Sequence, residues 1–123
     1  MLDDAALRFL TEPHLATLTT LRADGSPHVV AVGFTYSPEE RLVRVITFAD
    51  SVKARNAARG GRAAVSQVDG GRWLTLEGSV TVTDEPARVA RALEMYAARY
   101  RPPGERSDRV AIEITVDRIL GRA

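Results

Sequence analysis

Runs of β-branched and alternately apolar residues, each followed by a turn motif, restrict the fold of this chain more than any other feature. The segment 14–21 alternates and is rich in threonine, and the Asp24-Gly25 pair after it is typical of a hairpin turn. In the segment 110–117, valine or isoleucine occupies every second position. A period of two predicts a strand with one buried face. The segments expected as strands are 14–21, 29–34, 42–48, 63–68, 73–83 and 110–117.

The segment from Val29 to Phe34 departs from this alternation. Its residues are apolar almost without interruption, and Pro27 stands shortly before it. A continuous apolar run of this length is typical of a strand that is buried on both faces. We therefore expect neither face of this strand to be open to solvent.

Three short helices are expected around the strands. Asp3 is a suitable N-cap for the first helix, which ends before Pro13. Ser51 caps the second helix, which ends near Gly60, and Pro86 opens the third. Four side chains form one apolar stripe along the third helix: Val89, Leu93, Tyr96 and Tyr100.

These elements predict an α+β fold that is mainly β. About six antiparallel strands, joined mostly by hairpins and flanked by short helices, favour a barrel, because closure leaves no exposed sheet edge. A chain of 123 residues is long enough to bury one core. We therefore expect a single domain over residues 1–123.

Composition and motifs narrow the possible functions. A net charge of +1 gives no general attraction for nucleic acid. Without cysteine, and with His14 and His28 as the only histidines, neither a thiolate site nor a zinc site is expected. Nucleotide-binding glycine loops and the serine-nucleophile elbow do not occur, so any redox chemistry is expected from a bound cofactor. The absence of cysteine, of a secretory signal and of a long apolar run predicts a cytoplasmic protein without membrane contact.

Lys53 marks a candidate anion site. It is the one lysine among the 17 basic residues and follows Ser51 in the first turn of the second helix. Free backbone N–H groups carry positive partial charge in such a turn, and no acidic residue occurs between Asp50 and Asp69. An ammonium group in this setting suits a phosphate, although an ordinary solvated lysine would give the same pattern.

The order of several short motifs resembles a known family. Together they resemble the pyridoxamine phosphate oxidase-like split β-barrel superfamily, and within it the branch that uses the deazaflavin coenzyme F420. The segments 21–24, 27–35 and 66–70 resemble the biliverdin-reducing members of that branch in mycobacteria. The resemblance covers nearly the whole chain and rests on five motifs in order: 14–21, 24–30, 44–47, 51–56 and 72–78.

This resemblance implies a split β-barrel of the FMN-binding type that forms a homodimer, with two cofactor sites at the subunit interface. Reduced F420 is then the expected hydride donor to a conjugated acceptor, most simply biliverdin, which becomes bilirubin. The resemblance further implies that Lys53, within a segment that also holds Ser51 and Asn56, contacts the cofactor phosphate. Arg55 lies roughly 200° from Lys53 around the helix, so it is expected to meet a more distal anionic tail or solvent. The resemblance also places eight other residues near the cofactor, and each of them has an ordinary structural role as an alternative. They are Thr47, Pro27, His28, Val29, Val30, Val32, Gln67 and Trp73.

Two other functions are consistent with the same residues. The site could hold FMN, because both cofactors carry a phosphate, or the chain could be a carrier of a flavin or tetrapyrrole without enzymatic activity. Arg72, Arg101 and Arg106 are candidates for binding tetrapyrrole carboxylates. Catalytic residues are not assigned by the sequence; water, an arginine or Tyr36 are the candidates for the proton donor.

Overall fold

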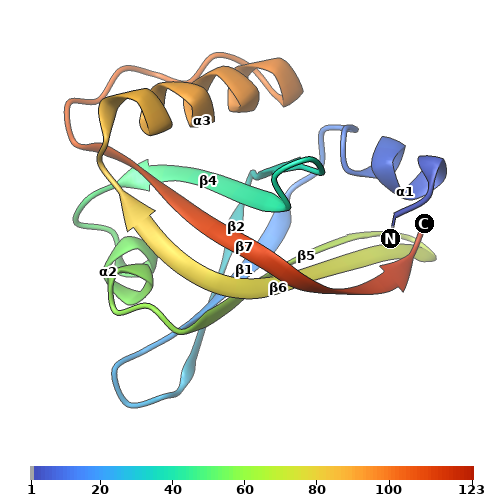
Figure 1. Cartoon of the computed structure of the whole chain (residues 1–123), viewed down its shortest axis with the longest axis horizontal. Coiled ribbons are helices and arrows are strands. Elements are labelled where there is room, and N and C mark those ends of the chain that lie inside the picture. Colours follow the sequence, from blue (N-terminus) through green and yellow to red (C-terminus); the bar gives the residue numbers. More distant parts are fainter. Residues whose placement is uncertain (1) are drawn as a thin grey trace.

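The structure, a computed structural model, describes residues 2–123 as a curved antiparallel sheet with helices around it (Figure 1). Residue 1 of the predicted domain lies outside the described part. Within residues 2–123 no helix is long and apolar enough to cross a membrane. In chain order the elements are α1 (Asp4–Phe9), β1 (Ala16–Leu21), β2 (Pro27–Val32), β3 (Thr35–Ser37), β4 (Leu42–Phe48), α2 (Val52–Ala58), β5 (Arg62–Asp69), β6 (Arg72–Thr83), α3 (Pro86–Arg99) and β7 (Arg109–Arg122).

Seven strands form one sheet in the order β2-β1-β5-β6-β7-β4-β3, with antiparallel neighbours throughout. β2 and β3 lie at opposite edges of this order, although only Gly33 and Phe34 separate them in the chain. The sheet must therefore curl until its two edges approach each other. This geometry confirms the predicted α+β, mainly β class and the split β-barrel.

The core lies inside the curved sheet. Along β1, Ala16, Leu18 and Thr20 are buried while Thr17 and Leu21 are exposed, as a period of two predicts. The helices cover different parts of the barrel: α3 contacts β3, β4 and β7, whereas α2 contacts β1, β6 and β7. The largest fully buried side chains include Phe9, Phe34, Leu18, Leu76, Ile112 and Ile114.

The prediction that the segment 29–34 is buried on both faces is wrong. β2 ends at Val32 and alternates, so that Val32 is buried while Val29 is 58% exposed. The chain then crosses to β3, a short strand that the sequence pattern did not reveal. The continuous apolar run therefore serves a strand with one outward face, a crossover and the start of a second strand.

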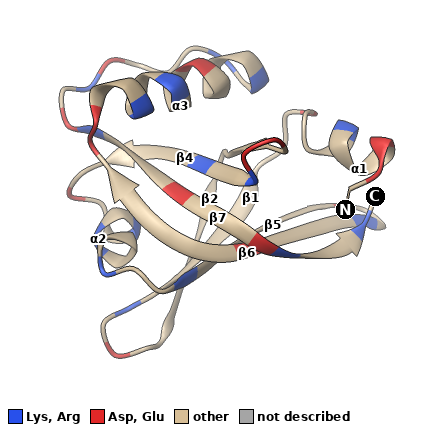
Figure 2. Cartoon of the chain, in the orientation of Figure 1, with Lys and Arg blue, Asp and Glu red and all other residues tan. Residues whose placement is uncertain are grey.

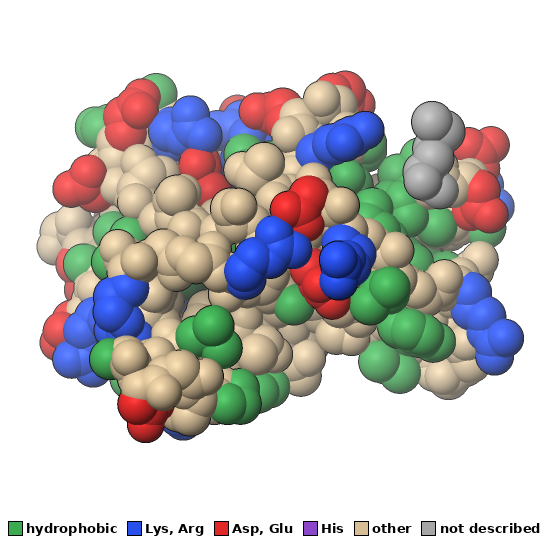
Figure 3. Space-filling model, turned by 60° about the horizontal axis from the view of Figure 1, so that its bottom comes forward, with side chains coloured by type: hydrophobic (Ala, Val, Ile, Leu, Met, Phe, Trp, Pro, Cys, Tyr) green, Lys and Arg blue, Asp and Glu red, His purple; other side chains and the backbone are tan. Residues whose placement is uncertain are grey.

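Charged residues of both signs are spread over the molecule. Most lie on the helices, in the connecting segments and near strand ends (Figure 2). On the face shown in Figure 3, acidic and basic side chains adjoin one another, and hydrophobic side chains form separate patches between them. This face therefore carries no broad region of a single sign, in line with the net charge of +1.

Candidate functional site

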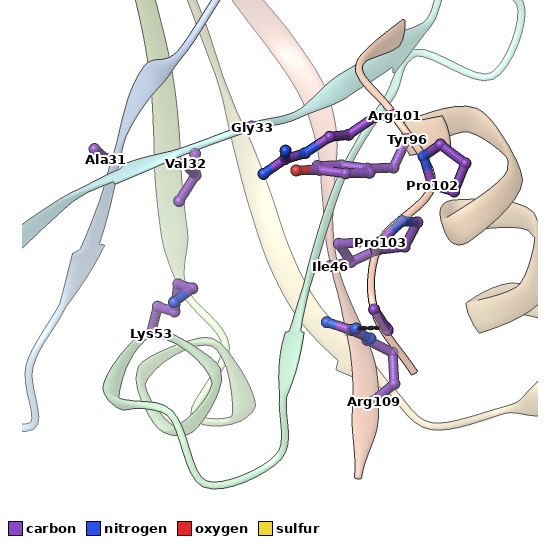
Figure 4. Close-up of a pocket in the computed structure, with 11 residues that line it drawn as sticks. Ala31, Val32, Gly33, Ile46, Lys53, Tyr96, Arg101, Pro102, Pro103 and Arg109 are labelled. Carbon is purple, nitrogen blue, oxygen red and sulfur yellow. Dashed lines mark hydrogen bonds between the residues drawn. The ribbon is translucent and has the colours of Figure 1, made fainter. Parts of the chain in front are cut away.

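A cavity of about 470 Å³ lies between β2, β4, α2 and the segment that links α3 to β7 (Figure 4). This volume is within the range of small-molecule and cofactor sites. None of the described residues that line the cavity is acidic, whereas three are basic. The lining residues are Ala31, Val32, Gly33, Ile46, Lys53, Tyr96, Arg101, Pro102, Pro103, Gly104 and Arg109.

Lys53 enters the cavity from α2. Ser51 begins this helix as its N-cap, since its Oγ accepts a hydrogen bond from the Ala54 N–H at 3.1 Å, and Thr47 donates to the same Oγ at 3.1 Å. Lys53 has no carboxylate partner within residues 2–123, and burial lowers the pKa of its ammonium group. Because α2 has only seven residues, we attribute the cationic character of this wall to Lys53 itself rather than to the helix dipole.

Two arginines face Lys53 from the other side of the cavity (Figure 4). Arg101 and Arg109 both belong to the segment after α3. Arg109 donates to the Gly104 carbonyl oxygen at 2.6 Å, which fixes its guanidinium group at the cavity wall. Both are outside every ion pair found in residues 2–123. The cavity therefore places three cations around a space that suits an anionic ligand.

Tyr96 of α3 lines the cavity beside β2, and it packs against Tyr100, the C-cap residue that follows the helix. Their ring centroids lie 4.9 Å apart. Gly33 makes room for them, because a Cβ at that position would lie 3.1 Å from ring carbons of both tyrosines. The Tyr100 hydroxyl donates to the His14 carbonyl oxygen at 2.7 Å and accepts from the Phe34 N–H at 3.2 Å. These contacts fix the end of α3 against the β2–β3 crossover.

Some of the residues predicted to bind the cofactor meet at this cavity. Lys53 and Val32 line it, and Arg101, a candidate for a substrate carboxylate, lines it as well. Ser51 and Thr47 are buried next to Lys53 and hold the start of α2 rather than the ligand. The predicted segment around Lys53 is thus at the cavity, but part of its polar content is used within the protein.

Other predicted residues are not brought to the cavity. Arg55 lines a separate hollow beside Thr83 and Val110, as its angular offset from Lys53 predicts. Asn56 is buried and donates to the Thr20 Oγ1 at 3.0 Å. Gln67 is fully buried; its amide donates to the Phe9 carbonyl oxygen and accepts from Arg99. In the single chain, neither Asn56 nor Gln67 is free to contact a ligand.

The predicted residues of β2 divide between its two faces. His28 and Val30 alternate with Pro27 and Val29, so that the first pair is half-buried and the second exposed. The His28 Nδ1 is buried without a hydrogen-bond partner within residues 2–123. Trp73 lies at the start of β6, 39% exposed, opposite Val68 of β5. In one chain, these side chains therefore lie on different faces of the sheet and do not gather at the cavity.

The other arginines singled out by the sequence are paired with acids. Arg106 forms an ion pair with Asp108 at 2.8 Å. Arg72 bridges Glu12 and Asp69, at 3.1 and 2.6 Å. His14 lies in the same group, 3.0 Å from Glu12, which places one imidazole and two carboxylates close together. Because Arg72 pairs with both carboxylates and His14 contacts one of them, we interpret this group as an internal ion-pair network.

Comparison with known proteins identifies the family. The family model described as pyridoxamine 5'-phosphate oxidase matches residues 2–123. The chain belongs to this family. It is 56% identical over 122 residues to the F420H(2)-dependent biliverdin reductase of Mycobacterium tuberculosis, covering 99% of this chain and 89% of that protein.

Solved structures in the comparison have the same fold. A conserved hypothetical protein from Mycobacterium tuberculosis matches with a TM-score of 0.82 at 24% identity, covering 99% of this chain and 85% of the other. An F420 reductase matches with a TM-score of 0.78 at 26% identity, covering 97% and 98% of the two chains. The split barrel of the pyridoxamine 5'-phosphate oxidase family therefore extends over essentially all described residues.

Two polar cavity residues, Tyr96 and Arg109, are not among the site residues that the sequence predicts. The sequence pattern places Tyr96 only in the apolar stripe of the third helix, and it does not single out Arg109. The available clue was their position: Tyr96 is followed by Tyr100 and Arg101, and Arg109 ends the same proline-containing segment. Only the fold places both ends of this segment opposite Lys53.

Proposed function

We propose that this chain is a cytoplasmic oxidoreductase that uses reduced coenzyme F420 to reduce a conjugated tetrapyrrole, with biliverdin as the acceptor and bilirubin as the product. The observation that carries the proposal is the cation-lined cavity, with Lys53 on one wall and Arg101 and Arg109 on the other. It is supported by the 56% identity with a biliverdin reductase that depends on F420H(2). The absence of cysteine suits a reducing compartment.

The cavity fits the phosphate end of the cofactor. The partly desolvated Lys53 ammonium lacks an internal carboxylate partner, so a phosphate would satisfy it. Ile46, Val32 and Pro103 supply apolar surface beside it, which suits a planar ring system. When bound there in its reduced form, F420 supplies a hydride. The chain would bind and orient the reactants.

The cationic wall opposite Lys53 fits the acceptor. Biliverdin carries two carboxylate side chains, and guanidinium groups bind carboxylates through paired N–H donors. Arg101 and Arg109 present such donors at the cavity, whereas Arg72 and Arg106 are occupied by Asp69, Glu12 and Asp108. We therefore assign acceptor binding to Arg101 and Arg109.

A homodimer is part of the proposal. The strand register places Ala31, Thr17, Ser66 and Thr75 in one row across four strands. Apolar side chains are exposed around this row, and Ala31 also lines the cavity, so a second copy packed on this face would border the site. On such a dimer, Val29 and Trp73 would reach the cofactor of the partner subunit. The exposed apolar residues of this face are Leu15, Leu21, Val29, Val68, Trp73 and Leu120.

FMN is the alternative cofactor. The matching family is described by pyridoxamine 5'-phosphate oxidase, and a lysine that holds a phosphate does not distinguish FMN from F420. Competition separates the two cofactors. If F420 is the cofactor, it should displace FMN from the protein at equal concentrations, and FMN should displace little F420.

The reaction is tested by mixing the purified protein with reduced F420 and biliverdin and following the absorbance of both. We expect oxidation of F420 and formation of bilirubin in equal amounts, and little product when reduced FMN replaces reduced F420. No change above a protein-free control would contradict the reductase. Tight binding of biliverdin without turnover by either cofactor would instead indicate a carrier.

A further inference from the structure

Tyr96 is a cavity residue for which the fold gives no structural explanation of its hydroxyl group. Its ring lines the cavity, and Figure 4 shows the hydroxyl oxygen directed inward near Arg101. Within residues 2–123 this hydroxyl has no hydrogen-bond partner, whereas the Tyr100 hydroxyl contacts the backbone of His14 and Phe34. Tyr100 therefore has a structural role, and Tyr96 presents a free phenol to the occupant of the cavity.

The ring of Tyr96 is held in place by its neighbours, although its hydroxyl group is free. Its ring packs against Tyr100 with centroids 4.9 Å apart, and Gly33 closes the other side. Tyr100 is in turn fixed by its hydrogen bond to the His14 carbonyl oxygen. A phenol held in this way can meet a bound ligand without first being ordered, which favours a role in the reaction itself.

The reduction needs a proton as well as a hydride. When hydride reaches the central methine carbon of the tetrapyrrole, a new C–H bond forms and the electron pair of the conjugated system moves to a pyrrole nitrogen. That nitrogen must then gain a proton to give the neutral product. The group that supplies this proton has to be at the cavity surface and has to release a proton readily.

Among the residues that line the cavity, one side chain is left as a candidate for the proton donor. Seven of them carry no side-chain proton that could be transferred: Ala31, Val32, Gly33, Ile46, Pro102, Pro103 and Gly104. The guanidinium groups of Arg101 and Arg109 do not give up protons in proteins. Lys53 is committed to the cofactor phosphate. Tyr96 remains as the proton source.

We propose that Tyr96 is the general acid of the reaction, an inference that rests on the proposed function. Its O–H bond breaks as the N–H bond of the reduced tetrapyrrole forms, and the phenolate then regains a proton from water. The two electrons come from the reduced deazaflavin as a hydride, and the oxidised deazaflavin releases one proton to solvent. That proton balances the one that water returns to Tyr96.

The test compares Tyr96→Phe with the wild type and with Tyr36→Phe. Tyr36, which the sequence leaves among the candidates for the proton donor, does not line this cavity. It lies in a different one beside Pro38 and Arg41 and is therefore the matched control. We expect Tyr96→Phe to lower turnover about 100-fold, the usual effect of losing a general acid, and Tyr36→Phe to leave it unchanged. Affinity for F420 and the thermal unfolding temperature should be unaffected in both variants. Equal turnover of Tyr96→Phe and wild type would overturn the proposal, because water would then supply the proton.

A second measurement does not depend on turnover. Biliverdin is added to protein that holds oxidised F420, which cannot donate a hydride, and its visible spectrum is recorded. A phenol that donates to a pyrrole nitrogen should shift the band of the bound tetrapyrrole, and Tyr96→Phe should bind it without that shift. Identical spectra would contradict the assignment of Tyr96. Lack of turnover by the wild type would instead contradict the proposed function.

Discussion

Arg99 joins three parts of the chain at the end of α3. Its guanidinium donates to the Glu12 carbonyl oxygen at 2.7 Å, to the Phe34 carbonyl oxygen at 2.6 Å and to the Gln67 side chain at 2.6 Å. Burial lowers the pKa of this guanidinium, yet it stays charged because arginine has so high an ordinary value. The same contacts explain why Gln67, expected near the cofactor, is used inside the fold.

Replacing Arg99 by alanine should destabilise the fold strongly. The change removes the Arg99 donor from the fully buried Gln67 oxygen and from the Glu12 carbonyl oxygen, so we expect a loss of about 2–3 kcal/mol in the free energy of unfolding. Arg91→Ala is the control, since Arg91 is exposed and forms a surface ion pair with Glu94; its effect should stay below about 0.5 kcal/mol. Urea unfolding measures both. Equal effects would show that the Arg99 network adds no stability.

Residue type and local spacing point to Lys53 as a candidate anion-binding residue, because an ammonium after an N-cap is a local pattern, and the structure places Lys53 at the cavity. They do not reveal the internal hydrogen bonds of Gln67 and Asn56. A polar side chain in a strand or helix looks the same in sequence whether it meets a ligand or a distant backbone carbonyl group, and the partners here are 58 and 36 positions away. Long-range partners of this kind have no local signature.

In the β2–β3 crossover, the close packing of the chain against two tyrosine rings requires a glycine at position 33. In Gly33→Ala the new methyl group would lie 3.1 Å from ring carbons of Tyr96 and Tyr100, which forces the tyrosine pair to shift. We expect a several-fold loss of F420 affinity and about 1–3 kcal/mol of destabilisation. Gly71→Ala, where nothing lies within 4 Å, is the matched control. Calorimetry and cofactor titration of both variants check this, and unchanged affinity of Gly33→Ala would contradict a role of the crossover in the site.

The ion-pair network around Arg72 links the segment after α1 to the β5–β6 turn, and it should make stability depend on acid. Glu12 accepts hydrogen bonds from Arg72 and from His14. These bonds, the one from Arg72 most, lower the pKa of Glu12 from an ordinary 4.5 to about 2. The folded chain thus binds this proton less readily than the unfolded chain, so the stabilisation is complete above about pH 4.5 and is lost as the pH falls toward 2. In Glu12→Gln the urea midpoint of unfolding should therefore decrease less between pH 4.5 and pH 2 than in the wild type, as measured by urea unfolding at several pH values. The same decrease in both proteins would contradict a stabilising role of the Glu12 carboxylate.

Strand patterns predicted most elements but not the split between β2 and β3. The hydrophobic period and turn residues are local, so they placed β4, β5 and β6 well. The run from Val29 to Phe34 is apolar for two different reasons: Val32 and Phe34 are buried in the core, whereas Val29 belongs to an exposed face. Sequence hydrophobicity does not separate core burial from a surface that suits a partner.

At the level of the whole molecule, the apolar outer face of β1, β2, β5 and β6 predicts a dimer. Native mass spectrometry should give twice the 13.4 kDa chain mass. Val68→Asp places a charge on this face beside Trp73, where Val68 is 63% exposed, and should shift the protein to monomer with the fold intact. Ala90→Asp, on the exposed side of α3, should leave the dimer unchanged. A wild-type monomer at micromolar concentration would contradict the dimer.

The cavity shows what a sequence alone does not reveal about the assembled molecule. Its walls come from segments that are far apart in the chain, and the curl of the sheet and the docking of α3 bring them together. Local patterns supplied Lys53 and Arg101 as candidates. That they line one cavity from opposite sides, together with Tyr96, follows only from the tertiary structure.

Binding of F420 by Lys53 is tested most directly by titrating F420 into wild-type protein, Lys53→Ala, Lys53→Arg and Arg55→Ala, with cofactor fluorescence as the readout. A charge-assisted contact with the phosphate contributes about 1.5–3 kcal/mol, so Lys53→Ala should weaken binding roughly tenfold to a hundredfold. Lys53→Arg should recover part of this loss, and Arg55→Ala, which lies outside the cavity, should bind like the wild type. Equal affinity of Lys53→Ala and wild type would contradict the assignment of the cavity as the cofactor site.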